Sequence, residues 1–197
     1  LKIVGTNPIK HDGLDKVMGR AKFGADAFLP GMLVGKILRS PHAHANIKSI
    51  DTSKAEALPG VKAVITSSDF PEKKAGTPPG DMTRNVMARE KALYDGHPVA
   101  ALAATSEKIA KQALKLIEVD YEILPHVIDP VEAMKPDAPI LHDYLRTKGV
   151  EGAEDKQTNV TERMVTQLGD IDAGFEEADV IVERSYDSKP MHQGYIE

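Results

Sequence analysis

The most regular pattern of apolar and polar residues lies between positions 99 and 122. Residues 99–104 (VAALAA) are small and apolar, which is typical of a buried strand. Ser106 can cap a following helix, in which lysines occupy one side and apolar residues the other. The apolar positions recur at the spacing of one helix face: Ile109, Ala113, Leu116 and Ile117. Residues 118–122 then alternate as a half-buried strand, so the pattern predicts a unit of the α/β type.

Shorter elements are predicted on both sides of this unit. Three further strands are indicated by apolar runs: 32–38, 47–50 and 62–66. Residues 54–58 fit a short helix that a Pro-Gly pair ends. Nearer the C-terminus, Asp170 can cap a helix that runs to Glu177, and residues 180–186 alternate as another strand.

Three stretches are predicted as loops or linkers. Residues 71–84 contain Pro78-Pro79-Gly80, which exclude a regular element there, so we expect a mobile surface loop. Residues 125–142 contain four prolines and predict a crossover or linker. Residues 149–159 are polar and charged, which is typical of another loop.

Length and composition are those of an ordinary soluble globular protein. The chain has 197 residues, of which 41% are hydrophobic, and this suits one domain or one domain plus part of a second. No run approaches the roughly 20 apolar residues that span a bilayer, so we expect no membrane association. The first residue is Leu1 and not a methionine, so the natural start is expected to lie upstream.

The distribution of charge suggests two modules. The net charge of −5 argues against broad binding to nucleic acid phosphates. Residues 151–197 hold four basic and twelve acidic residues, whereas the first 150 residues carry a net charge of +3. Such a shift indicates a change of module after residue 150.

Candidate catalytic and metal-binding patterns are few. The chain has no cysteine, so an iron–sulfur cluster with Cys ligands would have to be held elsewhere. His42 and His44 point the same way if the backbone is extended, but without an evident third ligand we interpret them as packed or hydrogen-bonded side chains. The segment from Asp170 lacks the spacing of a calcium loop. Asn159-Val160-Thr161 matches a glycosylation triplet, which we interpret as chance.

The segment from Met191 to Glu197 (MHQGYIE) differs from an ordinary surface segment. It follows a proline and mixes polar and aromatic groups. One interpretation is an unfinished strand whose partners are missing. The other is a segment that approaches a buried cofactor in a larger protein.

Many short strings of residues occur in one order along nearly the whole chain. They are KVMGRAKF (16–23), PGML (30–33), LRSPHAHA (38–45), LPGV (58–61), GHPVA (96–100), VDYEILP (119–125), GDID (169–172), ADV (178–180) and MHQGYIE (191–197). In this order and spacing they resemble the start of the large subunit of the molybdenum hydroxylases, the xanthine dehydrogenase and aldehyde oxidase family. Each string is weak alone, and their number and order make the resemblance specific.

The resemblance implies an α+β fold in three parts. Residues 1–125 would form an α/β hammerhead domain, residues 126–150 a linker, and residues 151–197 the truncated beginning of a mixed α/β molybdopterin-binding domain. We therefore expect a piece of a larger enzyme that ends before the catalytic residues. No catalytic or metal-binding residue is predicted here. Only His192, Gln193 and Glu197 are named as cofactor-binding candidates, because they are nearest in sequence to the missing site.

The resemblance also implies the chemistry and partners of the parent protein, a cytoplasmic oxidoreductase. That enzyme would hydroxylate a carbon centre with oxygen from water at a molybdopterin-bound molybdenum. Electrons would leave to iron–sulfur and flavin centres on other domains or subunits. The partners of this chain would be those components and the remainder of the large subunit, and the chain itself is expected to be inactive.

A second hypothesis places the chain in another class. It would be a stand-alone domain that assembles subunits or binds a partner protein, without catalysis. A coding sequence that stops directly after Glu197 would favour this second hypothesis.

Overall fold

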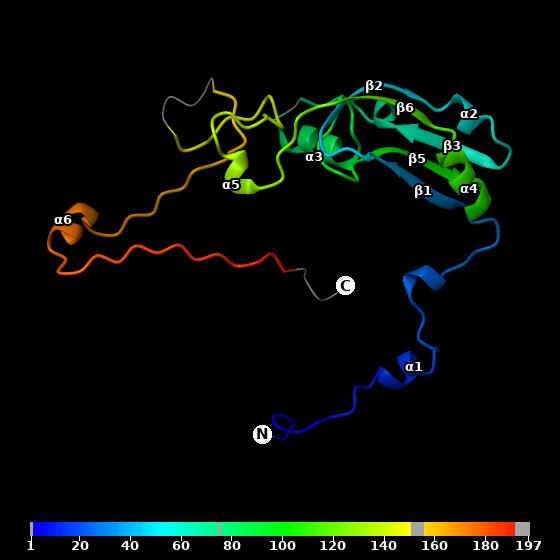
Figure 1. The fold of residues 1–197 in the computed structure, drawn as a ribbon. Helices are drawn as coiled ribbons and strands as arrows, with labels where there is room; N and C mark the ends of the chain where they lie inside the picture. The colour runs from blue at the N-terminus through cyan, green and yellow to red at the C-terminus, as the bar shows by residue number, and fades with distance from the viewer. Residues whose placement is uncertain (1, 75, 151–155, 192–197) are drawn as a thin grey trace.

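The computed structural model describes residues 2–74, 76–150 and 156–191. Figure 1 shows two small sheets and several helices in one body, from which stretches near both termini extend. Each sheet has three strands, and neighbouring strands in both sheets pair antiparallel. Antiparallel sheets with helices packed beside them define an α+β fold, so the predicted fold class is confirmed.

The first sheet has β5 (Pro98–Ala104) at its centre, between β1 (Val34–Arg39) and β3 (Val61–Thr66). A central strand is covered on both edges, and here the small side chains of Ala100 and Ala104 are fully buried. The apolar run at 99–104 was therefore predicted correctly as a buried strand.

The second sheet has β2 (Ala45–Asp51) at its centre, between β4 (Lys91–Ala92) and β6 (Glu118–Ile123). Along β6 the acidic residues are exposed, and Val119 and Tyr121 are half-buried. This confirms the strand predicted from alternation. The two-residue β4 is too short to leave a pattern in the sequence.

Helix α4 (Glu107–Leu114) connects the two sheets. Ser106 begins the helix, because its Oγ accepts a hydrogen bond from the backbone N–H of Ile109 at 3.3 Å. The predicted face is confirmed, since Ala113 is fully buried and Ile117 is 7% exposed. The neighbouring Ala110 is also fully buried, and α4 packs against the first sheet. The helix leads from β5 to β6, which belongs to the other sheet, so the strand–helix–strand unit links two sheets.

The short helix α2 (Ser53–Glu56) leads into β3 through Gly60. The φ of Gly60 is +95°, a backbone conformation that favours glycine. A Cβ placed there would lie 2.7 Å from Ile109 Cδ1. The turn therefore favours glycine here, and a larger residue would also have to displace the end of the Ile109 side chain.

The stretch predicted as a mobile loop contains helix α3 (Pro78–Val86), so that prediction was wrong. Thr77 begins the helix, and its Oγ1 accepts a hydrogen bond from Gly80 N–H at 3.4 Å. The two prolines occupy the first helical positions, where a backbone N–H has no intrahelical partner in any case. The residues that seemed to exclude a helix instead start one.

The remaining helical elements are short. They are α1 (Gly13–Val17), the 3-10 turns Gly24–Asp26 and Ser67–Asp69, α5 (Pro130–Ala133) and α6 (Ile171–Glu176). Asp170 caps α6 as predicted, since its carboxylate accepts a hydrogen bond from Ala173 N–H at 3.0 Å. The predicted strand at 180–186 is wrong: this stretch is not assigned to a strand, and its apolar side chains are exposed.

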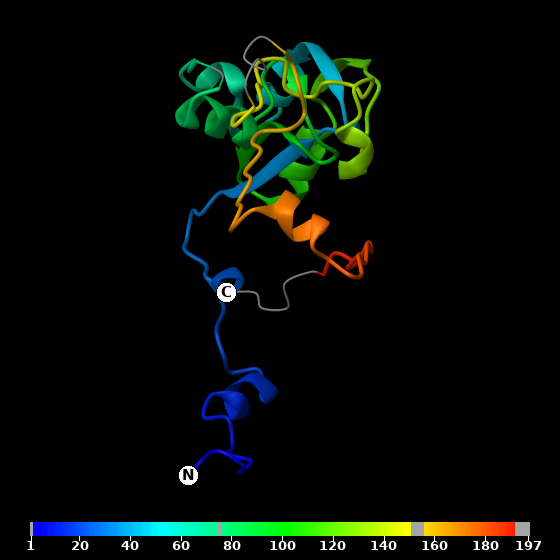
Figure 2. The same cartoon turned by 90° about the vertical axis from the view of Figure 1, so that its left-hand side faces the viewer.

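Two stretches lie outside the body of the fold, and we call residues 2–33 the N-terminal arm and residues 164–191 the C-terminal arm. In Figure 1 the N-terminal arm leaves the body at the right, near β1, and the C-terminal arm leaves it at the left, beyond α5; in Figure 2 both run below the body. Their large apolar side chains are exposed, for example Phe28 at 77% and Leu168 at 97%. Among the helices in the described ranges, none is long and apolar enough to cross a membrane.

Candidate functional site

Two loops that are far apart in the sequence meet beside the first sheet. The backbone N–H of Ser40 donates to His97 O at 2.8 Å, and that of Gly96 donates to Ser40 O at 2.9 Å. Arg39 adds a bond from Nη1 to Gly96 O at 2.8 Å. Gly96 has a φ of +82°, a backbone conformation that favours glycine. The junction brings the loop that carries His42 and His44 next to His97.

His97 is the centre of this junction. It is fully buried, and its ring stacks on Tyr94 with centroids 4.3 Å apart. Its Nδ1 accepts from Leu93 N–H at 3.1 Å, and its Nε2 lies 2.8 Å from Arg84 O. A carbonyl oxygen only accepts, so Nε2 carries the proton and the ring is the neutral Nε2–H tautomer. Burial lowers the pKa of His97, which keeps this form at neutral pH.

Acidification below pH 6.5 is therefore expected to destabilise the wild-type chain more steeply than a His97→Gln variant. The histidine titrates near 6.5 in the unfolded chain and at a lower pKa in the folded chain. Between these values unfolding takes up a proton, so the stability supplied by the neutral ring is complete above pH 6.5 and falls as the pH falls. Denaturant unfolding between pH 7.5 and 5 measures this, and a wild-type advantage that stays constant over the range would contradict it.

His42 and His44 make different contacts within the fold. His44 is 5% exposed, and its Nδ1 lies 2.7 Å from Pro125 O, to which it donates. His42 packs its ring edge against Tyr121, with centroids 5.1 Å apart. The interpretation of both histidines as packed or hydrogen-bonded side chains is confirmed.

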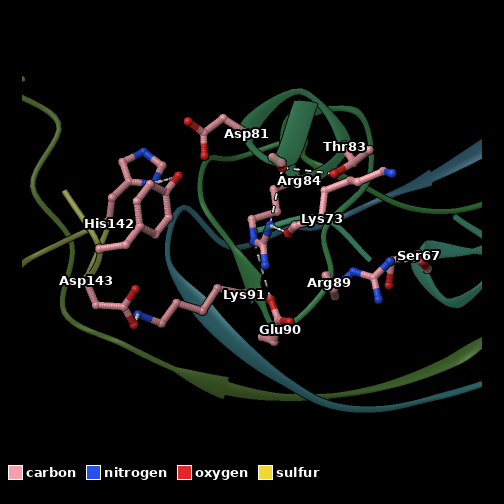
Figure 3. A network of polar contacts seen from close by, with 12 residues as sticks. Ser67, Lys73, Asp81, Thr83, Arg84, Arg89, Glu90, Lys91, His142 and Asp143 are labelled. Carbon is pink, nitrogen blue, oxygen red and sulfur yellow. Dashed lines mark hydrogen bonds and ion pairs between the residues drawn. The ribbon is translucent and has the colours of Figure 1, made fainter. Parts of the chain in front are cut away.

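Two arginines, Arg84 in α3 and Arg89 just after it, bind backbone carbonyls of the 3-10 turn at Ser67–Asp69 and of the loop that follows it. Arg89 Nη2 donates to Ser67 O at 2.7 Å, and Arg84 Nη1 donates to Lys73 O at 2.8 Å. Arg84 also lies 3.9 Å from a Glu90 carboxylate oxygen. Figure 3 shows both guanidinium groups pointing at backbone carbonyls of this region. The network ties the backbone at Ser67 and at Lys73 to residues 84–89.

Residues 142–144 contact this network. Tyr144 Oη lies 3.2 Å from His142 Nδ1, and Lys91 Nζ lies 3.5 Å from an Asp143 oxygen, as Figure 3 shows for the second pair. Burial lowers the pKa of His142. Burial and then the neighbouring Asp81 carboxylate raise the pKa of Tyr144 to about 12. Both rings are therefore neutral at physiological pH.

Asn159 holds the linker in place. Its Nδ2 donates to Ala133 O at 3.0 Å and to Pro139 O at 2.9 Å. Its Oδ1 accepts from Leu141 N–H at 3.0 Å. The amide is therefore fully used within the fold, which agrees with the interpretation of the glycosylation triplet as chance.

Asn159→Ala is expected to speed amide exchange of Leu141 roughly 10- to 100-fold, because it leaves three backbone groups without a hydrogen-bond partner. A buried polar group that loses its partner costs about 1–3 kcal/mol of stability. Asn159→Asp keeps the acceptor for Leu141 but places a carboxylate oxygen against two carbonyl oxygens, so it is expected to exchange at least as fast. The exposed Asn85→Ala serves as control. Unchanged exchange at Leu141 in both Asn159 variants would contradict the role of this side chain.

These contacts surround a cavity of about 500 Å³. Five stretches of chain line it: 43–44, 93–95, 126–128, 133–145 and 159–161. Its wall is mainly aliphatic, with His44 and His142 among the polar side chains. Cavities of this size and character are typical of sites for small molecules.

Residues that could hold a metal do not gather here. Among residues 2–74, 76–150 and 156–191, no three His, Asp or Glu side chains lie close enough together to hold a metal ion. Without cysteine the chain also offers no thiolate. These residues do not fit a molybdenum centre or an iron–sulfur cluster, so we derive no catalytic step from them. His192, Gln193 and Glu197 lie outside the described residues, and their cofactor role stays a prediction.

Sequence reasoning missed the residues on which the site depends most. His97 was noted only within the string GHPVA (96–100), and Asn159 only within a glycosylation triplet. The one available signal for His97 was its place directly before the apolar strand at 98–104, where a polar side chain has to be buried with a partner. The sequence held no signal for the partners themselves.

A comparison with protein families identifies the fold. The model of the aldehyde oxidase and xanthine dehydrogenase a/b hammerhead domain matches residues 18–125. The two antiparallel sheets, α4 and the His97 junction all lie within these residues. The chain belongs to the aldehyde oxidase and xanthine dehydrogenase family.

Individual relatives of this chain agree with this family assignment. The large chain of carbon monoxide dehydrogenase from Afipia carboxidovorans is 40% identical over 91% of this chain and 23% of that protein. The nicotinate dehydrogenase large molybdopterin subunit of Eubacterium barkeri is 32% identical over 100% of this chain and 43% of that protein. A solved structure of reconstituted CO dehydrogenase from Oligotropha carboxidovorans matches 89% of this chain and 22% of that chain, at 39% identity and a TM-score of 0.72. The chain thus spans less than half the length of these relatives.

Proposed function

We propose that this chain is the hammerhead part of the large subunit of a molybdenum hydroxylase, and that it acts as a structural part of that subunit. The observation that carries the proposal is the family match over residues 18–125 in a chain that spans 23% of the carbon monoxide dehydrogenase large chain. The parent enzyme hydroxylates a carbon centre with oxygen from water, and the molybdenum cofactor supplies the redox chemistry when bound. We propose a cytoplasmic location for it.

The proposal divides the chain into three parts. Residues 1–125 are the hammerhead domain, residues 126–150 the linker and residues 151–197 the beginning of the molybdopterin-binding domain. One relative is itself called a large molybdopterin subunit, which supports this division.

The two arms indicate where the partners bind. Exposed side chains such as Phe28, Leu29, Val180 and Ile181 leave a large apolar surface without cover. We propose that the arms pack against the remainder of the large subunit, and that iron–sulfur and flavin components join that assembly. A stand-alone assembly domain would instead cover its arms by association with copies of itself or with another protein.

Amide exchange of the C-terminal arm tests this proposal. We expect residues 164–191 to exchange at least 100-fold more slowly in the complete polypeptide than in the 197-residue chain, because packing against the rest of the subunit buries them. The amides of β5 serve as control and should exchange alike in both. Fast exchange of the arm in both proteins would contradict the proposal. Slow exchange in the 197-residue chain alone, increasing with its concentration, would favour the assembly domain.

A further inference from the structure

One face of the first sheet packs against α4, and the opposite face is open to solvent. In the central strand β5, which lies between β1 and β3 (Figure 1), Ala100, Leu102 and Ala104 belong to the buried core cluster that α4 covers. Side chains alternate across a strand, so Ala101 and Ala103 point to the opposite face. They are only half-buried, whereas their neighbours on the α4 side are buried.

The strand register places apolar residues across this second face. We call the outer face the set of residues that form two rows across the three strands: Gly35, Ile37, Ala63, Ile65, Ala101 and Ala103. Ile37 is 45% exposed and Ile65 is 38% exposed, one on each side of Ala101. The outer face is therefore an apolar surface that water contacts.

Charged side chains lie beside the outer face and not on it. The three strands contain three charged residues: Lys36, Arg39 and Lys62. Lys36 points to the α4 side, where its Nζ lies 3.2 Å from a Glu107 carboxylate oxygen. Arg39 ends β1, and its Nη1 donates to Gly96 O. An uncharged partner therefore fits the outer face best, since a charged one would lose its hydration without gaining a counter-charge.

Gly35 on the outer face is a glycine that the fold of this chain does not require. Its φ is not positive, and a Cβ placed on it would meet one atom within 4 Å, Leu102 O at an ordinary 3.9 Å. Glycine weakens a strand and often marks a place where another backbone approaches closely. Together with the exposed Ile37 and Ile65, it indicates a partner that packs close against the sheet.

The size of the outer face decides between two kinds of partner. Strands about 4.8 Å apart and rows about 6.8 Å apart give the face an area of about 200 Å². A stable dimer buries about 800 Å² on each partner, so a second copy would gain too little from this face. A segment of the same polypeptide is held nearby by its covalent connection, and a small contact then suffices.

The surroundings of the outer face also favour a segment of the same polypeptide. The solved CO dehydrogenase chain that shares this fold is much longer, since the match covers 22% of it. The N-terminal arm ends two residues before Gly35, and its last residues, Met32 and Leu33, are 46% and 42% exposed. The apolar surface of that arm therefore continues into the outer face.

We propose that the outer face is a docking surface for an apolar, uncharged segment of the remainder of the large subunit. This segment lies flat on β5, between Ile37 and Ile65. The proposal rests on the proposed function, because it takes the chain to be part of that subunit. It adds a docking surface in the body of the fold to the two arms.

Single thiols on the two faces of β5 test the proposal, because the chain has no cysteine of its own. Ala103→Cys places a thiol on the outer face, and Ala104→Cys places one on the side of α4 as the matched control. Maleimide labelling of the peptide that contains each site is followed by mass spectrometry, relative to the same protein unfolded in denaturant. Ala103→Cys is expected to react roughly 100-fold more slowly in the complete large subunit than in the 197-residue chain. Ala104→Cys should be protected in both.

A second measurement uses the unaltered proteins and does not depend on the folding of a variant. In hydroxyl-radical footprinting, Ile37 and Ile65 should be oxidised several-fold less in the complete large subunit than in the 197-residue chain. Equal labelling of Ala103→Cys and equal oxidation of the two isoleucines in both proteins would overturn the proposal.

The remaining outcomes identify another occupant or separate this proposal from the proposed function. Protection in the 197-residue chain that increases with its concentration would assign the outer face to a second copy and overturn the proposal. Protection that arises only when another subunit is added would overturn it as well. If amide exchange shows the C-terminal arm protected in the complete subunit while Ala103→Cys reacts equally fast in both proteins, the proposed function stands and the docking surface is wrong.

Discussion

His97→Ala is expected to lower the free energy of unfolding by about 3–5 kcal/mol, the range found when a large buried ring is truncated to alanine. His97 is fully buried and stacks on Tyr94. The substitution opens a cavity, and it also leaves Leu93 N–H and Arg84 O without their partner. Denaturant unfolding at pH 7.5, where the neutral ring contributes fully, measures the loss.

Two comparison variants make this prediction specific. His97→Gln can still donate to the Arg84 carbonyl, so it should recover part of the loss. His11→Ala changes an exposed histidine in the N-terminal arm and should alter stability by less than about 0.5 kcal/mol. A His97→Ala variant as stable as the wild type would mean that the junction does not hold the two loops together.

Ala110→Leu is expected to lower the free energy of unfolding by about 3 kcal/mol, because a larger side chain has no room where α4 meets the first sheet. Ala110 is fully buried in a cluster that includes the equally buried Ala100, Ala104 and Ala113. Small side chains on both surfaces let the helix lie close to the strands. Thermal unfolding of the 197-residue chain measures the change.

Gln112→Leu is the matched control on the same helix. Gln112 is exposed, so the same side chain placed there should change stability by less than about 0.5 kcal/mol. Equal unfolding temperatures for Ala110→Leu and the wild type would show that α4 can shift away from the sheet, and would contradict the close packing described here.

The parts of the fold that could be predicted from the sequence are those with a local cause. Helix α4 was predicted because the Ser106 cap and the apolar face lie within twelve residues. The β6 strand was predicted because polar and apolar residues alternate along it, which indicates that one face of the strand is buried. Which sheet each strand joins could not be predicted, since pairing such as Ala45 with Ile123 depends on residues far apart in the chain.

Two predicted elements were wrong, the loop at residues 71–84 and the strand at residues 180–186, and the physical reasons differ. At Pro78 and Pro79 the prolines were taken as helix breakers, whereas the first turn of a helix tolerates them. At residues 180–186 the alternation is real, but a strand also needs a neighbour to accept its hydrogen bonds, and a sequence pattern does not supply one.

The site was less predictable than the fold. Its cavity is lined by five stretches between residues 43 and 161, and its polar contacts are mostly to backbone atoms. Backbone atoms carry no sequence signal, so neither the partner of His44 nor those of His97 could be named in advance. The resemblance to the family predicted the fold class and the family correctly, and it did not identify these contacts.

Molybdenum analysis tests the central claim most directly. The account predicts about one molybdenum and one pterin in the complete polypeptide that contains residues 1–197. The 197-residue chain, purified from the same cells, is predicted to hold neither in stoichiometric amount, because the account assigns the cofactor-holding residues to the remainder of the large subunit. Stoichiometric molybdenum in the 197-residue chain alone would contradict the account.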